Sequence, residues 1–277
     1  MNVVQADRTK APTSVDTPPP GGIGWWVTDV WLMAQRNLKR ILRSPDVLVM
    51  YAVVQPVMFI LLFVFVFGGA IQVPGGDYTQ FFVPGIFVQM IVFTAVAIVT
   101  VGVAEDMQRG VMDRFRSLPM SRASILIGRV GSEVLRNVIA LAVMIVCGVI
   151  IGFRFHGDLG QILGGFALLL LFGFSFSWLG AVAGLLLRSV EAAQSGMLAW
   201  LFPFAFISSI YVPVDSMPGW LGAYAANSPV TLITDTLRAW FNGQDAGSAP
   251  WLSAAWSVGM ILVLVPIAVL RLRRLSS

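Results

Sequence analysis

Six long apolar stretches without a charged residue in their cores dominate this chain. They cover residues 47–68, 81–104, 135–153, 162–187, 195–212 and 251–270, and Arg136 is the only charged side chain inside them. A helix needs about 20 apolar residues to cross roughly 30 Å of hydrocarbon, where the backbone must satisfy its own hydrogen bonds. The pattern therefore predicts an all-α integral membrane protein with six transmembrane helices.

Positive charge is distributed unevenly between these stretches. Of the 18 Lys and Arg residues, 16 fall before the first stretch, between the second and third (counting Arg136), between the fourth and fifth, or after the sixth. Loops rich in Lys and Arg stay in the cytoplasm. We therefore expect a multi-pass protein of the bacterial plasma membrane with both termini cytoplasmic, including the tail 271–277. Because the charges flank spans, they do not indicate nucleic-acid binding.

An amphipathic pattern follows a polar lead, residues 1–24, that we expect to be disordered. Over residues 25–46 we expect a connecting helix in the cytoplasmic membrane interface, with apolar residues on one face and positive charge on the other. It is either a plain anchor or a lever that also contacts a cytoplasmic partner. Its characteristic residues are Trp26, Trp31, Arg36, Lys39, Arg40 and Arg43.

The segment 105–133 is the longest cytoplasmic connection that we expect. It mixes charged residues with apolar ones such as Phe115 and Leu118, which a solvated loop does not need. Ser121 can cap a helix that starts at Arg122. The segment either rests on the membrane or docks into a partner's groove.

Residues 213–243 are too interrupted to span the membrane. We expect two short helices, about 217–226 and 229–241, re-entrant at the outer leaflet before the last span. Asp235 and Arg238 lie three residues apart and can form an ion pair on one helix face. Within the spans, glycines four apart at 148–152 and 180–184 allow close helix packing, more plausibly within the subunit than in a dimer.

Several kinds of chemistry are absent from the sequence. Lys10 and Lys39 are the only lysines, and neither lies in a nucleotide-binding P-loop, so this chain is not itself a P-loop ATPase. No carboxylate lies within the six stretches, whereas a carrier driven by protons or sodium usually has one there. The single histidine, His156, has no Cys or His neighbour with which to hold a metal. We therefore predict no catalytic residues and no metal site, and any transport must draw energy from elsewhere.

Two groups of residues resemble a known family. The first runs from Phe206 to Pro213 and continues with Met217-Pro218-x-Trp220, Asn227-Ser228-Pro229 and Arg238; the second is Glu105, Gly110 and the stretch from Arg116 to Arg122. Over about residues 25–275 the chain resembles the membrane subunit of ABC type-2 transporters, most closely the daunorubicin-resistance type of multidrug exporter. It departs from the family pattern at Asp106, Ser209 and Ser228.

The resemblance implies an exporter of hydrophobic or amphipathic molecules, such as a drug, antibiotic or lipid, within a permease domain at 47–270. It implies two cytoplasmic ATPase subunits that hold ATP and Mg, with no cofactor in this chain, and a second permease that is either a copy or a paralogue. The alternatives are a polysaccharide or polyol-lipid exporter, an ion-coupled carrier, or a membrane scaffold.

By the same resemblance, three sets of residues carry the function. The ATPase-coupling set is Glu105, Asp106, Gly110, Phe115, Arg116, Leu118, Pro119, Ser121 and Arg122. The substrate path, along the second and fifth spans, includes Phe82, Phe87, Gln89, Phe93, Phe204, Phe206, Ser208 and Tyr211. The outer helices contribute Pro213, Met217, Pro218, Trp220, Asn227, Pro229, Asp235 and Arg238.

Overall fold

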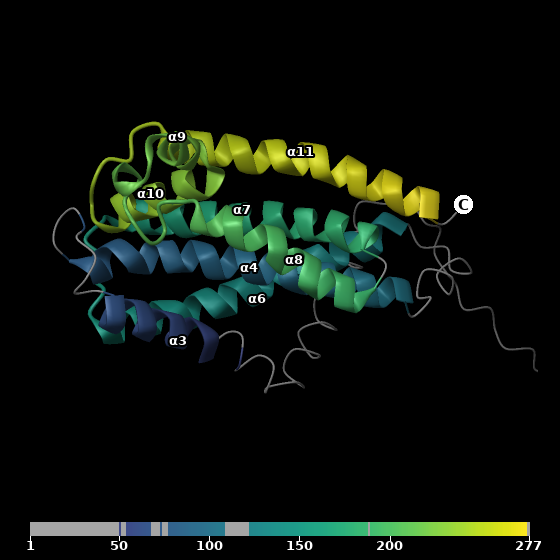
Figure 1. Ribbon diagram of the computed structural model, residues 1–277, viewed down its shortest axis with the longest axis horizontal. Coiled ribbons are helices and arrows are strands. Elements are labelled where there is room, and N and C mark those ends of the chain that lie inside the picture. The colour runs from purple at the N-terminus through teal and green to yellow at the C-terminus, as the bar shows by residue number, and fades with distance from the viewer. Residues whose placement is uncertain are drawn as a thin grey trace, which may run out of the picture.

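Helices form all the regular structure that the computed structural model describes, which covers residues 50, 54–67, 73, 77–108, 122–187 and 189–275. Four of these helices are long and apolar enough to cross a membrane: α4 (Tyr78–Gln108), α6 (Arg122–Ile151), α7 (Leu159–Leu186) and α11 (Ala249–Leu275). They run along the length of an elongated bundle (Figure 1). The predicted all-α class is therefore confirmed.

The first and fifth apolar stretches form shorter helices. In the first, α3 (Gln55–Leu61) continues into a π-helical segment, η2 (Leu62–Phe67). In the fifth, α8 (Val190–Phe206) contains Pro203 and ends where Ile207 leaves helical geometry, so the predicted bounds 195–212 are wrong. The N-terminus of α8 is set by Ser189, whose side chain accepts a hydrogen bond from the Ala192 amide at 3.1 Å. The count of six spans stays a prediction.

Helix α4 is the centre of the bundle and packs against α6, α7, α8 and α10. Its most apolar 18-residue window is 72% buried, compared with 17% for α11, which lies at the periphery. Close packing of α4 on α7 depends on glycine. A Cβ at Gly180 would lie 2.8 Å from the Val96 carbonyl oxygen, and one at Gly184 would lie 2.7 Å from that of Thr100. The glycines at 180–184 therefore pack within the subunit, as predicted.

The short elements η4 (Val214–Ser216), α9 (Gly219–Asn227) and α10 (Pro229–Phe241) gather at one end of the bundle (Figure 1). Pro229 occupies the first turn of α10, and Gly243, with a φ of 70°, follows its last turn. The α6–α7 connection holds this helix, because the His156 amide donates to the Phe241 carbonyl at 2.8 Å. Helix α10 thereby caps the ends of the long helices.

Helices α4 and α6 enter the predicted segment 105–133 from its two ends, and α6 starts at Arg122, where the sequence predicted a helix start. Helix α4 continues to Gln108 and α6 begins at Arg122, so only residues 109–121 of the predicted segment 105–133 lie between helices. The part of α6 able to span begins at Arg129 and includes Glu133, which is only 2% exposed. The prediction that Arg136 is the only charge within the spans is therefore wrong. Glu133 is tolerated there because Arg136 donates to its carboxylate at 2.6 Å.

Candidate functional site

Arg238 joins three parts of the chain at the capped end of the bundle. Its Nη1 donates to the Asp235 carboxylate at 2.7 Å, which confirms the predicted pair on α10. Its Nε donates to the carbonyl of Phe81 on α4 at 3.0 Å, and its Nη2 donates to the carbonyl of Ser209 at 2.9 Å. The planar guanidinium suits this role because it presents several donors in fixed directions.

Two further contacts complete this network. The guanidinium carbon of Arg238 lies 3.6 Å from the centre of the Phe81 ring, a cation–π arrangement. The Ser209 hydroxyl donates to Asp235 at 2.8 Å, and the Ser209 amide donates to the Thr231 hydroxyl at 3.1 Å. The irregular turn after α8 is thus held against α10 by polar contacts in place of helical hydrogen bonds.

An open cavity of about 710 Å³ lies beside this network. Asp77 and Gln80 at the start of α4 line it, together with Asp215, Asp235 and Arg238 from the capping elements. Burial raises the pKa of Asp235, and Arg238 opposes that rise. Burial also lowers the pKa of Arg238 to about 10, although the negative charge of Asp235 partly opposes this change. Because this pKa still lies well above 7, the guanidinium remains charged near neutral pH. The cavity offers a polar lining to a group entering from this end.

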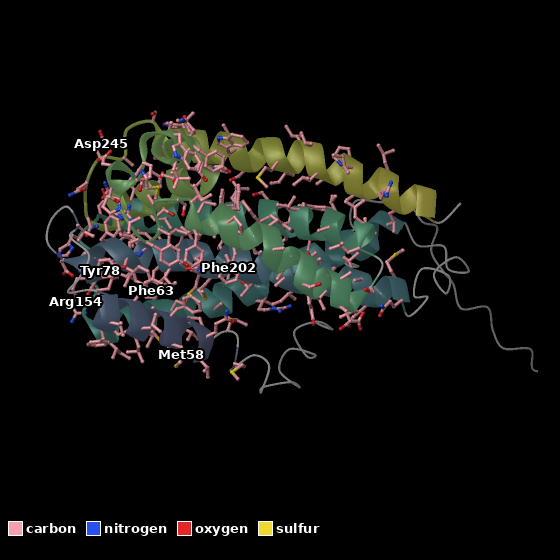
Figure 2. The ribbon with its side chains drawn as sticks, viewed as in Figure 1. Met58, Phe63, Tyr78, Arg154, Phe202 and Asp245 are labelled. Atoms are coloured by element: carbon pink, nitrogen blue, oxygen red, sulfur yellow. The ribbon has the colours of Figure 1, made fainter. Side chains whose placement is uncertain are left out.

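An aromatic cluster lies next to the cavity, between η2, α4 and the end of α8. Tyr211 stacks on Phe206 with 4.5 Å between ring centroids, lies 4.9 Å from Phe63, and lies 6.1 Å from Phe82. Tyr78 stacks on Phe82 at 5.5 Å. Figure 2 labels Tyr78, Phe63 and Phe202 along this side of the bundle. We call Phe63, Tyr78, Phe82, Phe202, Phe206 and Tyr211 the aromatic cluster.

The aromatic cluster continues onto the surface of the subunit. Phe202 stacks on Phe206 at 5.5 Å, and these side chains are 41% and 44% exposed. Trp200, on the same helix, is 36% exposed. A row of aromatic rings therefore leads from the buried Tyr211 to a surface that lipid or another protein must cover.

Polar groups without partners lie behind this cluster. Gln89 on α4 is 1% exposed, and within the described part of the chain neither polar atom of its amide has a hydrogen-bond partner. The Tyr211 hydroxyl lies beside this amide and interacts with it, but within the described residues neither group has a hydrogen bond of good geometry. Leaving such groups unpaired costs about 1–3 kcal/mol each. The pair therefore marks a place where a hydrogen-bonding group of a ligand would be stabilised.

The structure brings together only part of the predicted substrate path. Phe82, Phe206 and Tyr211 belong to the aromatic cluster, and Phe93 meets Phe202 edge-on at 5.4 Å. Phe87 packs elsewhere, against Phe153 and Phe241, and Phe204 packs against Phe176 of α7. The Ser208 hydroxyl donates to the Ala205 carbonyl one turn earlier.

The other predicted residues fall into three groups. Asp235 and Arg238 line the cavity, Trp220 is 77% exposed at the same end, and Pro213, Met217, Pro218, Asn227 and Pro229 belong to the capping elements. Glu105 and Asp106 lie near the opposite end of α4, and Arg122 begins α6. The remaining coupling residues and the expected interfacial helix at 25–46 lie outside the described residues.

Sequence reasoning did not include Phe63, and it did not link Phe81, which it placed on the second span, with Arg238. The Arg238 guanidinium lies over the Phe81 ring and donates a hydrogen bond to the Phe81 carbonyl. Phe63, from the first apolar stretch, belongs to the aromatic cluster. Phe81 and Arg238 are separated by 157 positions, and no local pattern links residues so far apart. Their pairing follows from the packing of α10 on α4.

This bundle, with its apolar long helices and capped end, defines a multi-pass α-helical membrane protein. The chain matches the ABC-2 type transporter family over residues 28–242 and belongs to that family. The matched region runs from before the described helices through α10, and therefore includes the aromatic cluster and the cavity lining up to Asn242. A multi-pass protein of the plasma membrane follows from this membership.

Similar proteins include drug-resistance permeases. The daunorubicin resistance ABC transporter permease DrrB1 of Streptomyces coeruleorubidus is 37% identical over 166 residues, which are 60% of this chain and 58% of that protein. The doxorubicin resistance permease DrrB of Mycobacterium tuberculosis is 29% identical over 171 residues, with 59% and 58% covered. The chain thus aligns with somewhat more than half the length of these relatives.

Proposed function

We propose that this chain is the membrane permease subunit of an ATP-driven exporter that moves hydrophobic or amphipathic molecules outward across the bacterial plasma membrane. The observation that carries the proposal is membership of the ABC-2 type transporter family across the helical bundle. The names of two similar proteins refer to daunorubicin and doxorubicin resistance, which favours a drug or antibiotic as substrate. The energy comes from a separate ATPase subunit that binds ATP and Mg.

We assign six spans to this permease: α3 with η2, α4, α6, α7, α8 and α11. The capping helices α9 and α10 lie on the outer side, and residues 109–121 and the C-terminus lie in the cytoplasm. Two observations support this orientation. Positive charge is concentrated in the segments that it places inside. The end of α11 also lies at the opposite end of the bundle from α9 and α10 (Figure 1).

Two cytoplasmic ATPase subunits bind the connection between α4 and α6. This segment carries Phe115 and Leu118 among charged residues, and a solvated loop has no use for such apolar side chains. The test replaces both with Asp and measures co-purification with the ATPase. Trp220→Asp, an equally disruptive change at the opposite end of the bundle, is the matched control. Loss of the complex in the double variant alone is expected; an undiminished complex would refute docking here.

The substrate passes along the aromatic cluster, between this chain and a second permease subunit. Exposed aromatic rings of α8 give area to an apolar molecule, and Gln89 and Tyr211 give it hydrogen bonds at the buried end. A substrate with a flat apolar body and a carbonyl or hydroxyl group fits this combination. The polar cavity at the outer end then receives the polar part of the molecule as it leaves.

The transport test uses inverted membrane vesicles that contain this chain with its ATPase. Daunorubicin and doxorubicin are the probes, and their ATP-dependent accumulation in the vesicles is measured. Accumulation should require ATP, disappear with a hydrolysis-deficient ATPase, and persist when an uncoupler removes the proton gradient. Accumulation that follows the proton gradient without ATP would support an ion-coupled carrier instead.

A further inference from the structure

A polar seam occupies the part of α6 that leads away from residues 109–121. Arg129, Glu133 and Asn137 are spaced four residues apart and so share one helix face. Glu133 and Asn137 are 2% and 1% exposed. The same face continues with the buried apolar residues Ala140, Leu141 and Met144. Charged residues in a helix able to span a membrane are costly and are usually functional.

Arg129 connects this seam to α4. Its Nη1 pairs with the carboxylate of Asp106, and both side chains are about one-quarter exposed, at 23% and 27%. The guanidinium occupies space that a Cβ at Gly102 would fill, because that Cβ would overlap Nη2 and Cζ. The glycine therefore lets Arg129 lie flat on α4. The ion pair joins the two helices on either side of residues 109–121.

Glu133 offers Arg129 a second partner. One carboxylate oxygen of Glu133 accepts the hydrogen bond from Arg136, while Oε2 has no partner within the described residues. Arg129 lies one turn away on the same helix and interacts electrostatically with this carboxylate. A buried carboxylate oxygen without a donor is unfavourable, so a donor that reaches it is strongly stabilised. Arg129 thus has one occupied carboxylate on α4 and one open acceptor on α6.

We propose that Arg129 is a two-position latch between α4 and α6. Bound to Asp106, it ties together the helices that flank residues 109–121. When these helices separate, the guanidinium leaves the partly exposed Asp106 to solvent and donates to Oε2 of Glu133, so Arg129 keeps a carboxylate partner. The exchange gives the bundle two arrangements in both of which Arg129 is paired, and a contact that favours one of them shifts the equilibrium towards it.

The direction of coupling rests on the proposed function. Force from an ATPase on residues 109–121 would act first on the ends of α4 and α6, where the latch lies. Arg129 is then a positioning residue that determines when these helices part. The latch itself depends only on contacts within this chain, so it can be tested without transport.

The test is a double-mutant cycle on the thermal stability of the purified full-length chain. The variants are Asp106→Asn, Glu133→Gln and their combination. Either single variant leaves Arg129 one carboxylate and should lower Tm modestly. The combination leaves Arg129 without a carboxylate and should lower Tm beyond the sum of the singles by about 3 °C or more. Glu133→Gln also weakens the bond between Glu133 and Arg136. This contribution to Tm is the same in the single and the double variant, so it does not affect the non-additivity.

A steric variant moves the latch without changing any charge. Gly102→Ala should displace the Arg129 guanidinium from α4. A second cycle that combines Gly102→Ala with Glu133→Gln should therefore also give a Tm loss larger than the sum of the two single losses. Gly131→Ala is its matched control, because a Cβ at Gly131 meets nothing within 4 Å. Should Glu133→Gln fail to fold, Glu133→Asp serves in its place, because it keeps the charge but shortens the reach to Arg129.

Additive Tm losses in these cycles would overturn the latch, because Glu133 would then not replace Asp106 as the partner of Arg129. In the complete transporter, Glu133→Gln should lower the amount of substrate moved per ATP hydrolysed, whereas Glu191→Gln, at an exposed site on α8, should not. An unchanged ratio in Glu133→Gln would also overturn it. A non-additive cycle in a chain that moves no substrate would refute only the proposed function and would leave the latch standing.

Discussion

Arg238 binds Phe81 twice, with its guanidinium 3.6 Å from the ring centre and its Nε 3.0 Å from the carbonyl oxygen of the same residue. One side chain of a short helix thereby holds the start of the central helix by both its ring and its backbone. The same guanidinium also holds Ser209 and Asp235. Arg238 thus links α10, the start of α4 and the turn after α8 at the capped end of the bundle.

Replacing Arg238 should therefore destabilise the fold. Arg238→Gln removes the charged donor from two backbone carbonyls and leaves the partly exposed Asp235 with only the Ser209 hydroxyl among these donors. We expect the free energy of unfolding to fall by about 1–3 kcal/mol. Arg238→Lys should recover part of the loss, because it keeps the charge but lacks the planar fork. Thermal unfolding followed by Trp fluorescence measures both. Arg154→Gln, at an exposed position of the same end, is the control, and an equal loss there would contradict the prediction.

The stability of the chain should depend on pH through Asp235. Burial raises the pKa of Asp235 in the folded state above its ordinary value of 3.8. As the pH falls from 7 towards 4, the folded state therefore binds a proton before the unfolded state does, and this group adds stability. The wild type should gain Tm relative to Asp235→Asn over this range. Asp215→Asn, at an exposed carboxylate of the same cavity, is the control, and its Tm should change with pH as that of the wild type does. If the Tm of Asp235→Asn changed with pH in the same way as that of the wild type, the prediction would be contradicted.

Gly180 should not tolerate a side chain. A methyl group there would lie 2.8 Å from the backbone oxygen of Val96, which cannot move without shifting α4. We expect Gly180→Ala to cost about 1–3 kcal/mol of stability. Gly259→Ala in α11, where a Cβ meets nothing within 4 Å, should be neutral or slightly stabilising. Similar Tm values for the two variants would show that α4 and α7 are packed less tightly than described.

Gln89 should show opposite effects on stability and transport. Gln89→Met removes two buried polar atoms that have no partner within the described chain, so stability should rise by about 1–3 kcal/mol. Transport of a hydrogen-bonding substrate should fall, because the site then lacks its amide. Gln161→Met is the control and should lower stability. It removes an amide oxygen that accepts a hydrogen bond from the Asp158 backbone amide in the capping box of α7. A stability loss in Gln89→Met would mean that the amide has a partner.

Much of the helical architecture was predictable from sequence, because it depends on local composition. Apolar length predicted α4, α7 and α11, and the interruption at Asn227-Ser228-Pro229 separated α9 from α10. The start of a helix at Arg122 was predicted, but its unbroken continuation through Glu133 into the third apolar stretch and the early end of α8 were not predictable in this way. In α6, tertiary burial lets Glu133 and Arg136 pair inside the helix. In α8, the Ser209 turn is stabilised by contacts to α10 instead of continuing the helix.

The candidate site divides along the same line. Spacing alone predicted the pair of Asp235 and Arg238, since residues three apart on a helix face one another. Neither the contact of Arg238 with Phe81 nor the convergence of Phe63, Phe82 and Tyr211 has a local signal. The predicted path also included Phe87 and Phe204, because sequence gives residue type but not the side of the helix on which an aromatic ring finds its neighbours.

By itself, the sequence determined the class of this protein: a chain of long apolar helices without a P-loop, basic at the segments predicted to face the cytoplasm. These properties depend on composition and on the cost of exposing backbone to lipid. Only the tertiary structure decided that Arg238 holds α4, that glycines bring α7 onto it, and that Arg129 of α6 pairs with Asp106 of α4. Such pairings require helices far apart in sequence to pack in one particular register, and uniformly apolar surfaces do not specify that register.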